Sequence, residues 1–218
     1  DVEAAIWRFP YVKYSRGINK NCPHSFNELF KQAVGEYVIH CNDDDAFTPD
    51  LIARMVAEMP YCTLCCVQPF FIDKDSRPFT PDHACHKVPK VVNLPREEWK
   101  IKLYHGTPYI GTTMYRRSLV DQIGMLNEQL NQISDLDFYI SVCEIGDIKV
   151  IEEPLYLFRI HDGNTSKVTP ENNKKFEEQL KMVRKRHYSK QVVNCPPVLQ
   201  QIEFMTNDPM SRFGWRTA

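Results

Sequence analysis

The chain has 218 residues, of which 43% are hydrophobic and 25% charged, and its formal net charge at pH 7 is -1. This composition is typical of a globular protein, and the charge balance excludes a global attraction to nucleic acid or anionic lipid. No run of about 18 apolar residues occurs, so we expect no transmembrane helix. The eight cysteines fall mostly in apolar segments, a placement that favours reduced thiols and a cytoplasmic location.

The first half of the chain alternates helix-like and strand-like patterns after an irregular start. Ser25 and Glu28 have the spacing of a capping box at the start of an apolar helical repeat. Thr48 and Pro49 open a second helix, with proline at its first position. The predicted elements are a helix over 25–34, a strand over 36–41, a helix from 49 to 59 and a strand over 62–72.

The second half begins with a long loop over 73–95, which is rich in Pro, Asp, His and Lys. The elements predicted after it are helices over 95–104, 116–123 and from 134, strands over 108–115, 147–151 and 155–160, and a long helix from 170. Such alternation predicts an α/β fold with a layered sheet flanked by helices, and ligands bind at the carboxyl ends of its strands. We assign residues 1–168 to a catalytic domain and 169–218 to a C-terminal helix and tail that pack on it.

An acidic turn, Asn42-Asp43-Asp44-Asp45, follows the first predicted strand. Three adjacent carboxylates repel one another, and a bound Mg²⁺ or Mn²⁺ relieves that repulsion. A solvated acidic turn without a metal is the simpler alternative. An EF-hand calcium loop is excluded, because the required Gly is absent and its twelfth position falls on Ala53 instead of Glu.

The segment from Gly35 to Pro49 resembles a signature of the family-two inverting glycosyltransferases, which have a GT-A fold. In that signature a G-E-Y strand leads into a D-x-D-type acidic turn, and a proline starts the next helix. Asn27 and Gly17 match further positions of the same family. The resemblance implies that Asp44 is the principal metal ligand, Asp45 a further one, and that Asp43 contacts the ribose or the metal.

The segment from Gly111 to Phe138 resembles the next part of that family. The resemblance implies that Gly111 and Thr112 line the donor-sugar pocket and that Asp135 is the general base. A carboxylate in the first turn of a helix favours its ionised form, as a base requires. The structural alternative is helix capping by Ser134 and Asp137.

The last matching segment, Leu155–Ser166, is similar to a "yR.H.gn.S" ending of the family. Arg159 and His161 lie two apart on a predicted strand, so they point to one face. A cation and an imidazole there suit the diphosphate and its metal. Gly163 and Asn164 fit a loop that closes over the donor.

The family's first strands have no counterpart before residue 17, so we expect the fold to be incomplete at the N-terminus or replaced there. Two residues depart from the family pattern: Asn42 stands at a usual Asp, and Ser134 at a usual Glu. These substitutions keep open a non-catalytic sugar- or nucleotide-binding module on a degenerate transferase fold.

Two further alternatives come from other clusters. A zinc-stabilised domain would use Cys62, Cys65 and Cys66 with ligands from the long loop, but a strand places the first two on opposite sides. A nucleic-acid acceptor would use the basic residues of the last helix, which otherwise form a solvated helix face. The clusters are Cys62, Cys65, Cys66, His83, Cys85 and His86 for zinc, and Lys181, Arg184, Lys185, Arg186 and His187 for nucleic acid.

The sequence therefore predicts a metal-dependent, inverting glycosyltransferase. It transfers a sugar from a nucleotide-diphosphate sugar to a hydroxyl acceptor, with Mn²⁺ or Mg²⁺ as cofactor. The central geometric prediction is that the acidic turn near Asp44 and the carboxylate of Asp135 meet in one pocket.

Overall fold

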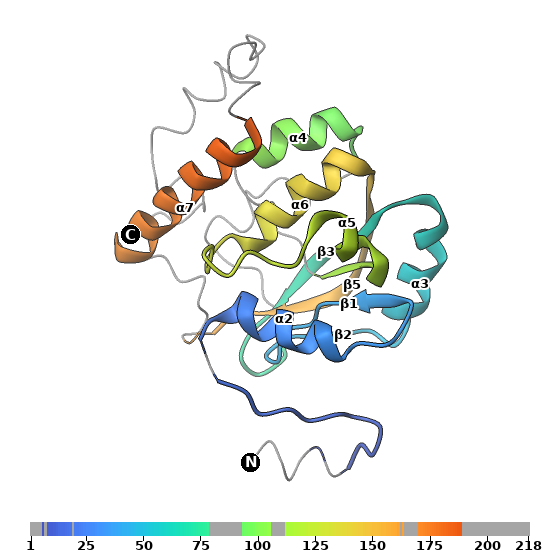
Figure 1. Ribbon diagram of the computed structural model, residues 1–218. Helices are drawn as coiled ribbons and strands as arrows, with labels where there is room; N and C mark the ends of the chain where they lie inside the picture. Colours follow the sequence, from blue (N-terminus) through green and yellow to red (C-terminus); the bar gives the residue numbers. More distant parts are fainter. Residues whose placement is uncertain are drawn as a thin grey trace.

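The computed structural model describes residues 6, 8–18, 20–78, 93–105, 112–161, 163 and 170–188. These residues form a mixed α/β structure with a five-stranded sheet and flanking helices (Figure 1), which confirms the predicted fold class. The helices are α2 (Cys22–Gln32), α3 (Leu51–Glu58), α4 (Arg96–His105), α5 (Val120–Ile123), α6 (Ser134–Ile145) and α7 (Pro170–Tyr188). The strands are β1 (Tyr37–Ile39), β2 (Ala46–Phe47), β3 (Leu64–Ile72), β4 (Thr113–Arg116) and β5 (Ile148–Arg159).

The strand order is β1-β4-β3-β5-β2. Strands β3 and β5 are parallel, whereas β4 is antiparallel to both of its neighbours, β1 and β3. Strands β1, β3 and β5 therefore run in the same direction, and their carboxyl ends lie at one edge of the sheet. The acidic turn leaves the sheet at that edge after β1, and Arg159 ends β5 beside Ile72 of β3.

Strand β5 corrects the prediction of two separate strands over 147–151 and 155–160. It is one strand of 12 residues that stays paired with β3 on both sides of an irregularity. There, residues 152–155 stand opposite the single residue Gln68. Residues 152–154 are exposed, so the strand bulges outward without leaving the sheet.

The two faces of the sheet bury separate apolar cores. Helices α4, α5, α6 and α7 contribute to one core, and α3 to the other, as their placement in Figure 1 shows. Neighbouring strand residues point to opposite faces: Cys66 lies in the first core and Cys65 in the second. The largest fully buried side chains include Trp99 and Leu103 of α4, Leu136 and Ile140 of α6, and Leu51 and Met55 of α3.

Helix α2 begins earlier than predicted, and its cap is a different residue. Asn21 caps it by accepting a hydrogen bond from the His24 backbone N–H at 2.9 Å. The predicted capping box is wrong, since Ser25 lies inside the helix and Glu28 pairs with Lys31. A polar residue in the preceding turn competes for the cap, and Pro23 in the first turn favours the earlier start.

Helix α6 also differs from its predicted start. Ser134 is its first helical residue, and the cap position is Ile133, which makes no side-chain capping bond. Helix α3 begins at Leu51, with Asp50 at its cap, two residues beyond the predicted Pro49. Helix α5 ends at Gly124 as predicted, because φ of +83° there suits glycine.

Of the predicted long loop, residues 73–78 and 93–95 are described, and the rest of it lies outside the described residues. Residues 108–111 of the predicted strand and the tail from 189 also lie outside them. Among the helices that are described, none combines the length and apolar character needed to cross a membrane.

Candidate active site

Asp45 anchors the acidic turn to strand β5. Its Oδ2 accepts hydrogen bonds from the Tyr156 hydroxyl at 2.7 Å and from Asn42 Nδ2 at 2.8 Å. Its Oδ1 accepts the Arg159 backbone N–H at 2.7 Å. Both carboxylate oxygens are thus bound to donors of the protein, and the side chain of Asn42, which replaces the usual acid, supports the same carboxylate.

Asp44 faces a different partner. Its Oδ2 lies 3.0 Å from His161 Nε2, and the two side chains are 35% and 30% exposed. The backbone carbonyl of Asp44 accepts Arg159 Nε–H at 2.7 Å. Arg159 and His161 therefore both reach Asp44, and a carboxylate and an imidazole meet at a partly exposed position.

Arg159 also ties strand β5 to the turn that follows β3. Its NH1 donates to the Asp73 carbonyl at 3.0 Å and to Ser76 Oγ at 2.9 Å. Asp73 supports this turn by accepting the backbone N–H groups of Asp75 and Arg77, bonds that lower the pKa of its carboxyl. One guanidinium thus joins the end of β5 to the segments that follow β1 and β3.

Helix α2 contacts the segments that precede the acidic turn and helix α6. The Phe26 ring stacks on His40 after β1, and Asn27 binds the Leu126 backbone in the loop that leads into α6. At the first residue of α2, partial burial raises the pKa of the Cys22 thiol, and the negative charges of Asp135 and then Asp43 raise it further. Of these two carboxylates, Asp43 is exposed and Asp135 is partly buried.

Asp135 is the second residue of α6 and is largely desolvated. Its Oδ1 accepts the Leu136 backbone N–H at 2.8 Å. Burial raises its pKa to about 6, and the backbone hydrogen bonds oppose that rise only in part. The expectation that the helix start would favour ionisation is thus outweighed by desolvation. No ion pair to Asp135 occurs within the described parts of the chain.

Asp137 does not cap α6, which corrects the capping alternative. Its carboxylate is buried and contacts Arg186 and His187 of helix α7. Arg184 of the same helix donates to the Tyr104 carbonyl at 3.0 Å. The basic residues at the end of α7 are therefore not simply a solvated face, because three of them bind to neighbouring helices.

Thr112 is buried next to strand β4, and its hydroxyl donates to the backbone carbonyl of His40. It joins the segment that precedes β4 to the end of β1. The other predicted pocket residue, Gly111, lies outside the described residues, as does Asn164. Gly163 is described, and its backbone N–H donates to His161 Nδ1 at 3.1 Å.

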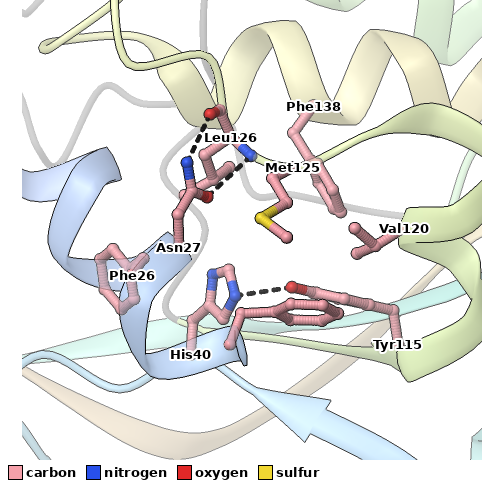
Figure 2. A pocket seen from close by; sticks show the side chains of 9 residues that line it. Phe26, Asn27, His40, Tyr115, Val120, Met125, Leu126 and Phe138 are labelled. Atoms are coloured by element: carbon pink, nitrogen blue, oxygen red, sulfur yellow. Dashed lines mark hydrogen bonds between the residues drawn. The ribbon is translucent and has the colours of Figure 1, made fainter. Parts of the chain in front are cut away.

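His40 and Tyr115 form a polar pair that sequence reasoning missed. The Tyr115 hydroxyl lies 2.7 Å from His40 Nε2, and the Phe26 ring stacks on the imidazole at 4.8 Å. Burial lowers the pKa of His40 to about 4, so the ring is neutral at physiological pH. Figure 2 shows this pair at the floor of a small hollow that has room for about one water molecule.

Asn27 closes the same hollow from helix α2. Its amide donates to the Leu126 carbonyl at 2.9 Å and accepts the Leu126 N–H at 3.1 Å (Figure 2). It also donates to Glu128 Oε1 at 3.1 Å. Asn27 thus fixes α2 to the loop that leads into α6. This structural role explains why an asparagine stands at that position of the motif.

The described residues do not assemble a zinc site. They contain no group of three or more His, Cys, Asp or Glu side chains able to hold a metal ion. Cys62 packs in the same core as Cys65, which corrects the prediction that these two face opposite sides, because Cys62 precedes the strand. His83, Cys85 and His86 lie outside the described residues.

The sequence matches a known family over more than half of its length. The profile of the family described as "Glycosyl transferase family 2" matches residues 4–124. The chain therefore belongs to glycosyl transferase family 2, as the motif resemblance implied. The match begins at residue 4, before Gly17, and the prediction that the family's first strands lack a counterpart here stays a prediction.

Individual relatives are more distant. The chain is 21% identical over 205 residues to the uncharacterized glycosyltransferase YwdF of Bacillus subtilis (strain 168), which covers 91% of this chain and 74% of that protein. It resembles crystal structures of S. aureus TarS 1–349, alone and in complex with UDP, with 13% and 16% identity and a TM-score of 0.45 for each. Each match covers 86% of this chain, which spans 59% and 58% of the two TarS chains.

Proposed function

We propose that this chain carries the catalytic site of a glycosyltransferase that moves a sugar from a nucleotide-diphosphate sugar to a hydroxyl acceptor. Membership in glycosyl transferase family 2 supports the class of reaction. The observation that carries the proposal is the contact of Asp44 with both His161 and Arg159 at the carboxyl edge of the sheet. Helix α2 links this region to the loop before α6, because Phe26 stacks on His40 and Asn27 binds Leu126.

Asp135 is the proposed general base. A carboxyl with a pKa of about 6 is mostly ionised at pH 7 and holds a proton more strongly than an ordinary aspartate. It accepts the proton of the acceptor hydroxyl while that oxygen attacks the anomeric carbon. A single displacement of this kind, with the diphosphate leaving from the opposite face, inverts the configuration of the sugar.

Asp44 and His161 are the proposed ligands of Mn²⁺ or Mg²⁺. An oxygen and an imidazole nitrogen that meet at a partly exposed position fit such a cation, whose remaining ligands are typically phosphate oxygens and water. The bound cation stabilises the charge of the leaving diphosphate. Asp45 holds the turn in place, and the exposed Asp43 is available to the donor.

Arg159 is proposed mainly as a positioning residue of this site. Its guanidinium and backbone N–H bind the acidic turn, and the same side chain binds the turn after β3. The donor diphosphate would lie against this edge of the sheet, near a fixed positive charge. The six described cysteines are free thiols, which supports the proposal of a cytoplasmic location.

The test is a screen of nucleotide-diphosphate sugars by thermal shift, with Mn²⁺, with Mg²⁺ and with chelator, followed by an assay of donor turnover. We expect at least one donor to raise the melting temperature only when the cation is present. The wild type should also turn that donor over. Binding without turnover would favour the non-catalytic binding module, and no binding of any donor would refute the proposal.

A further inference from the structure

Helix α7 contacts the helix start that carries Asp135, through Arg186 and His187. We propose that α7 positions the general base, with Arg186 and His187 acting through Asp137. The inference rests on the proposed function, because it concerns the same base. Arg186 and His187 are positioning residues in this account, since neither contacts the reacting atoms.

The first turn of α6 needs support from outside the helix. The cap position, Ile133, provides no side-chain hydrogen bond. Among the described residues, the side chain that binds a backbone N–H of this turn is that of Asp135 itself, which accepts the Leu136 N–H. A helix start without a capping residue is prone to fraying, and fraying here would move the base.

Asp137 supplies that support through two contacts with α7. Its Oδ2 lies 2.6 Å from Arg186 NH1, and its Oδ1 lies 2.7 Å from His187 Nε2. The Asp137 and His187 side chains are only 6% and 8% exposed. Hydrogen bonds to a carboxylate buried to this degree are costly to break, because the carboxylate would be left without partners.

A third contact fixes the loop immediately before α6. The Gln132 backbone N–H donates to Gln179 Oε1 of α7 at 3.0 Å. The helix α7 is in turn held on α4, because the Tyr188 hydroxyl donates to the Lys100 carbonyl at 2.8 Å. Leu180 and Val183 of α7 are each 1% exposed in the shared core. Helix α7 thus provides a firm support for the residues on both sides of Asp135.

The spacing of the two aspartates explains why this support sets the position of the base. Residues two apart are about 200° apart around a helix axis. Asp137 therefore points towards α7 while Asp135 points to the opposite side, where Cys22 and Tyr139 respond to its charge. Any rotation or fraying of this turn displaces both carboxylates together.

The experiment compares Arg186→Ala/His187→Ala with His187→Gln and with Lys185→Ala as the matched control. Lys185 is exposed and neighbours the pair, and the Gln amide can still donate to Asp137. The readouts are kcat and donor KM in the full chain, and backbone hydrogen exchange over residues 133–140. Far-UV circular dichroism confirms that each variant is folded.

We expect the double variant to lose about 10- to 100-fold in kcat with donor KM unchanged, and to exchange faster in the first turn of α6. His187→Gln, which keeps Arg186 and an amide donor to Asp137, should retain most of the wild-type kcat and most of the wild-type protection from exchange. Lys185→Ala should match the wild type. Unchanged exchange in the first turn of α6 would overturn the inference. A loss of kcat accompanied by faster exchange throughout the protein would also overturn it, because the variant would then be destabilised globally. If the wild type turns over no donor, the proposed function fails, and the exchange measurement alone decides whether α7 holds this turn.

Discussion

The acidic turn after β1 and the start of α6 both present carboxylates, but the surrounding protein treats them differently. In the turn, Asp45 has hydrogen-bond donors on both oxygens and Asp44 lies beside His161. At the start of α6, Asp135 is desolvated, and burial dominates its pKa. The carboxylates of the turn are thus bound to protein side chains and backbone groups, whereas that of Asp135 lies in a desolvated position.

This difference agrees with the two roles proposed for these carboxylates, cation binding in the turn and proton transfer at α6. A general base works best with a pKa close to the ambient pH, and burial provides it. Asp137, two residues from Asp135, is instead buried against Arg186 and His187 of α7 and therefore joins the two helices.

The largest expected effect is that of Asp135→Asn. The amide cannot accept the proton, so turnover should fall by about 10²- to 10⁴-fold while donor binding persists. Steady-state kinetics and donor thermal shifts measure the two separately. Asp121→Asn, on the exposed surface of α5, is the matched control. Retention of turnover in Asp135→Asn would assign the base to another residue.

Removal of the metal ligands should come next in size. Asp44→Asn and His161→Ala should each abolish the cation-dependent part of the donor thermal shift, and turnover should fall by about 10²- to 10³-fold. The comparison is made by titrating Mn²⁺ at saturating donor. Cation affinity equal to that of the wild type in both variants would contradict the assignment of these two ligands.

Asp45→Asn should act through the turn. One carboxylate oxygen becomes an NH₂ group that cannot accept the hydrogen bonds of Tyr156 or Arg159, so we expect a loss of about 1–3 kcal/mol in unfolding free energy. Cation affinity should weaken by about 10- to 100-fold, because Asp44 loses its support. Asp50→Asn, whose parent side chain makes no capping bond, is the control. An effect on turnover as large as that of Asp44→Asn would show that Asp45 is itself a ligand.

The smallest effect concerns pH. Since burial raises the pKa of Asp135 from 3.8 to about 6, ionisation destabilises the fold, and the cost develops as the pH rises from about 4 to 6. Asp135→Asn should therefore be more stable than the wild type by about 1–3 kcal/mol at pH 7.5, with the gap closing near pH 4. Urea unfolding at both pH values measures it. An equal difference in unfolding free energy at the two pH values would show that the added stability of Asp135→Asn has another cause.

Sequence reasoning identified the strands and helices that surround the site because their apolar periods are clear, as in Cys62–Ile72 and the helix that contains Leu180 and Val183. It also predicted that Arg159 and His161 lie on the same side of the sheet, because residues two apart on a strand point in the same direction. Caps were harder to predict. Asn21 and Ser25 are both good capping residues within about one turn of each other, and only the folded chain selects between them.

The roles of the individual acids were less predictable, because they depend on residues far away in sequence. The partners of Asp45 lie on β5, and those of Asp137 lie on α7. Desolvation of Asp135 depends on the tertiary packing around the start of α6 and leaves no local sequence pattern. His40 directly follows β1 and Tyr115 lies in β4, and nothing in the sequence pairs them before these two strands are aligned.

The outward bulge of β5 determines where this strand can tolerate insertions and deletions. Residues 152–154 lie outside the regular ladder and can absorb insertions or deletions without disturbing the pairs that flank them. A single residue added between Tyr156 and Arg159 would instead reverse the side of the sheet to which the later residues point. His161 would then turn away from Asp44, so length changes should be tolerated at the bulge and selected against a few positions later.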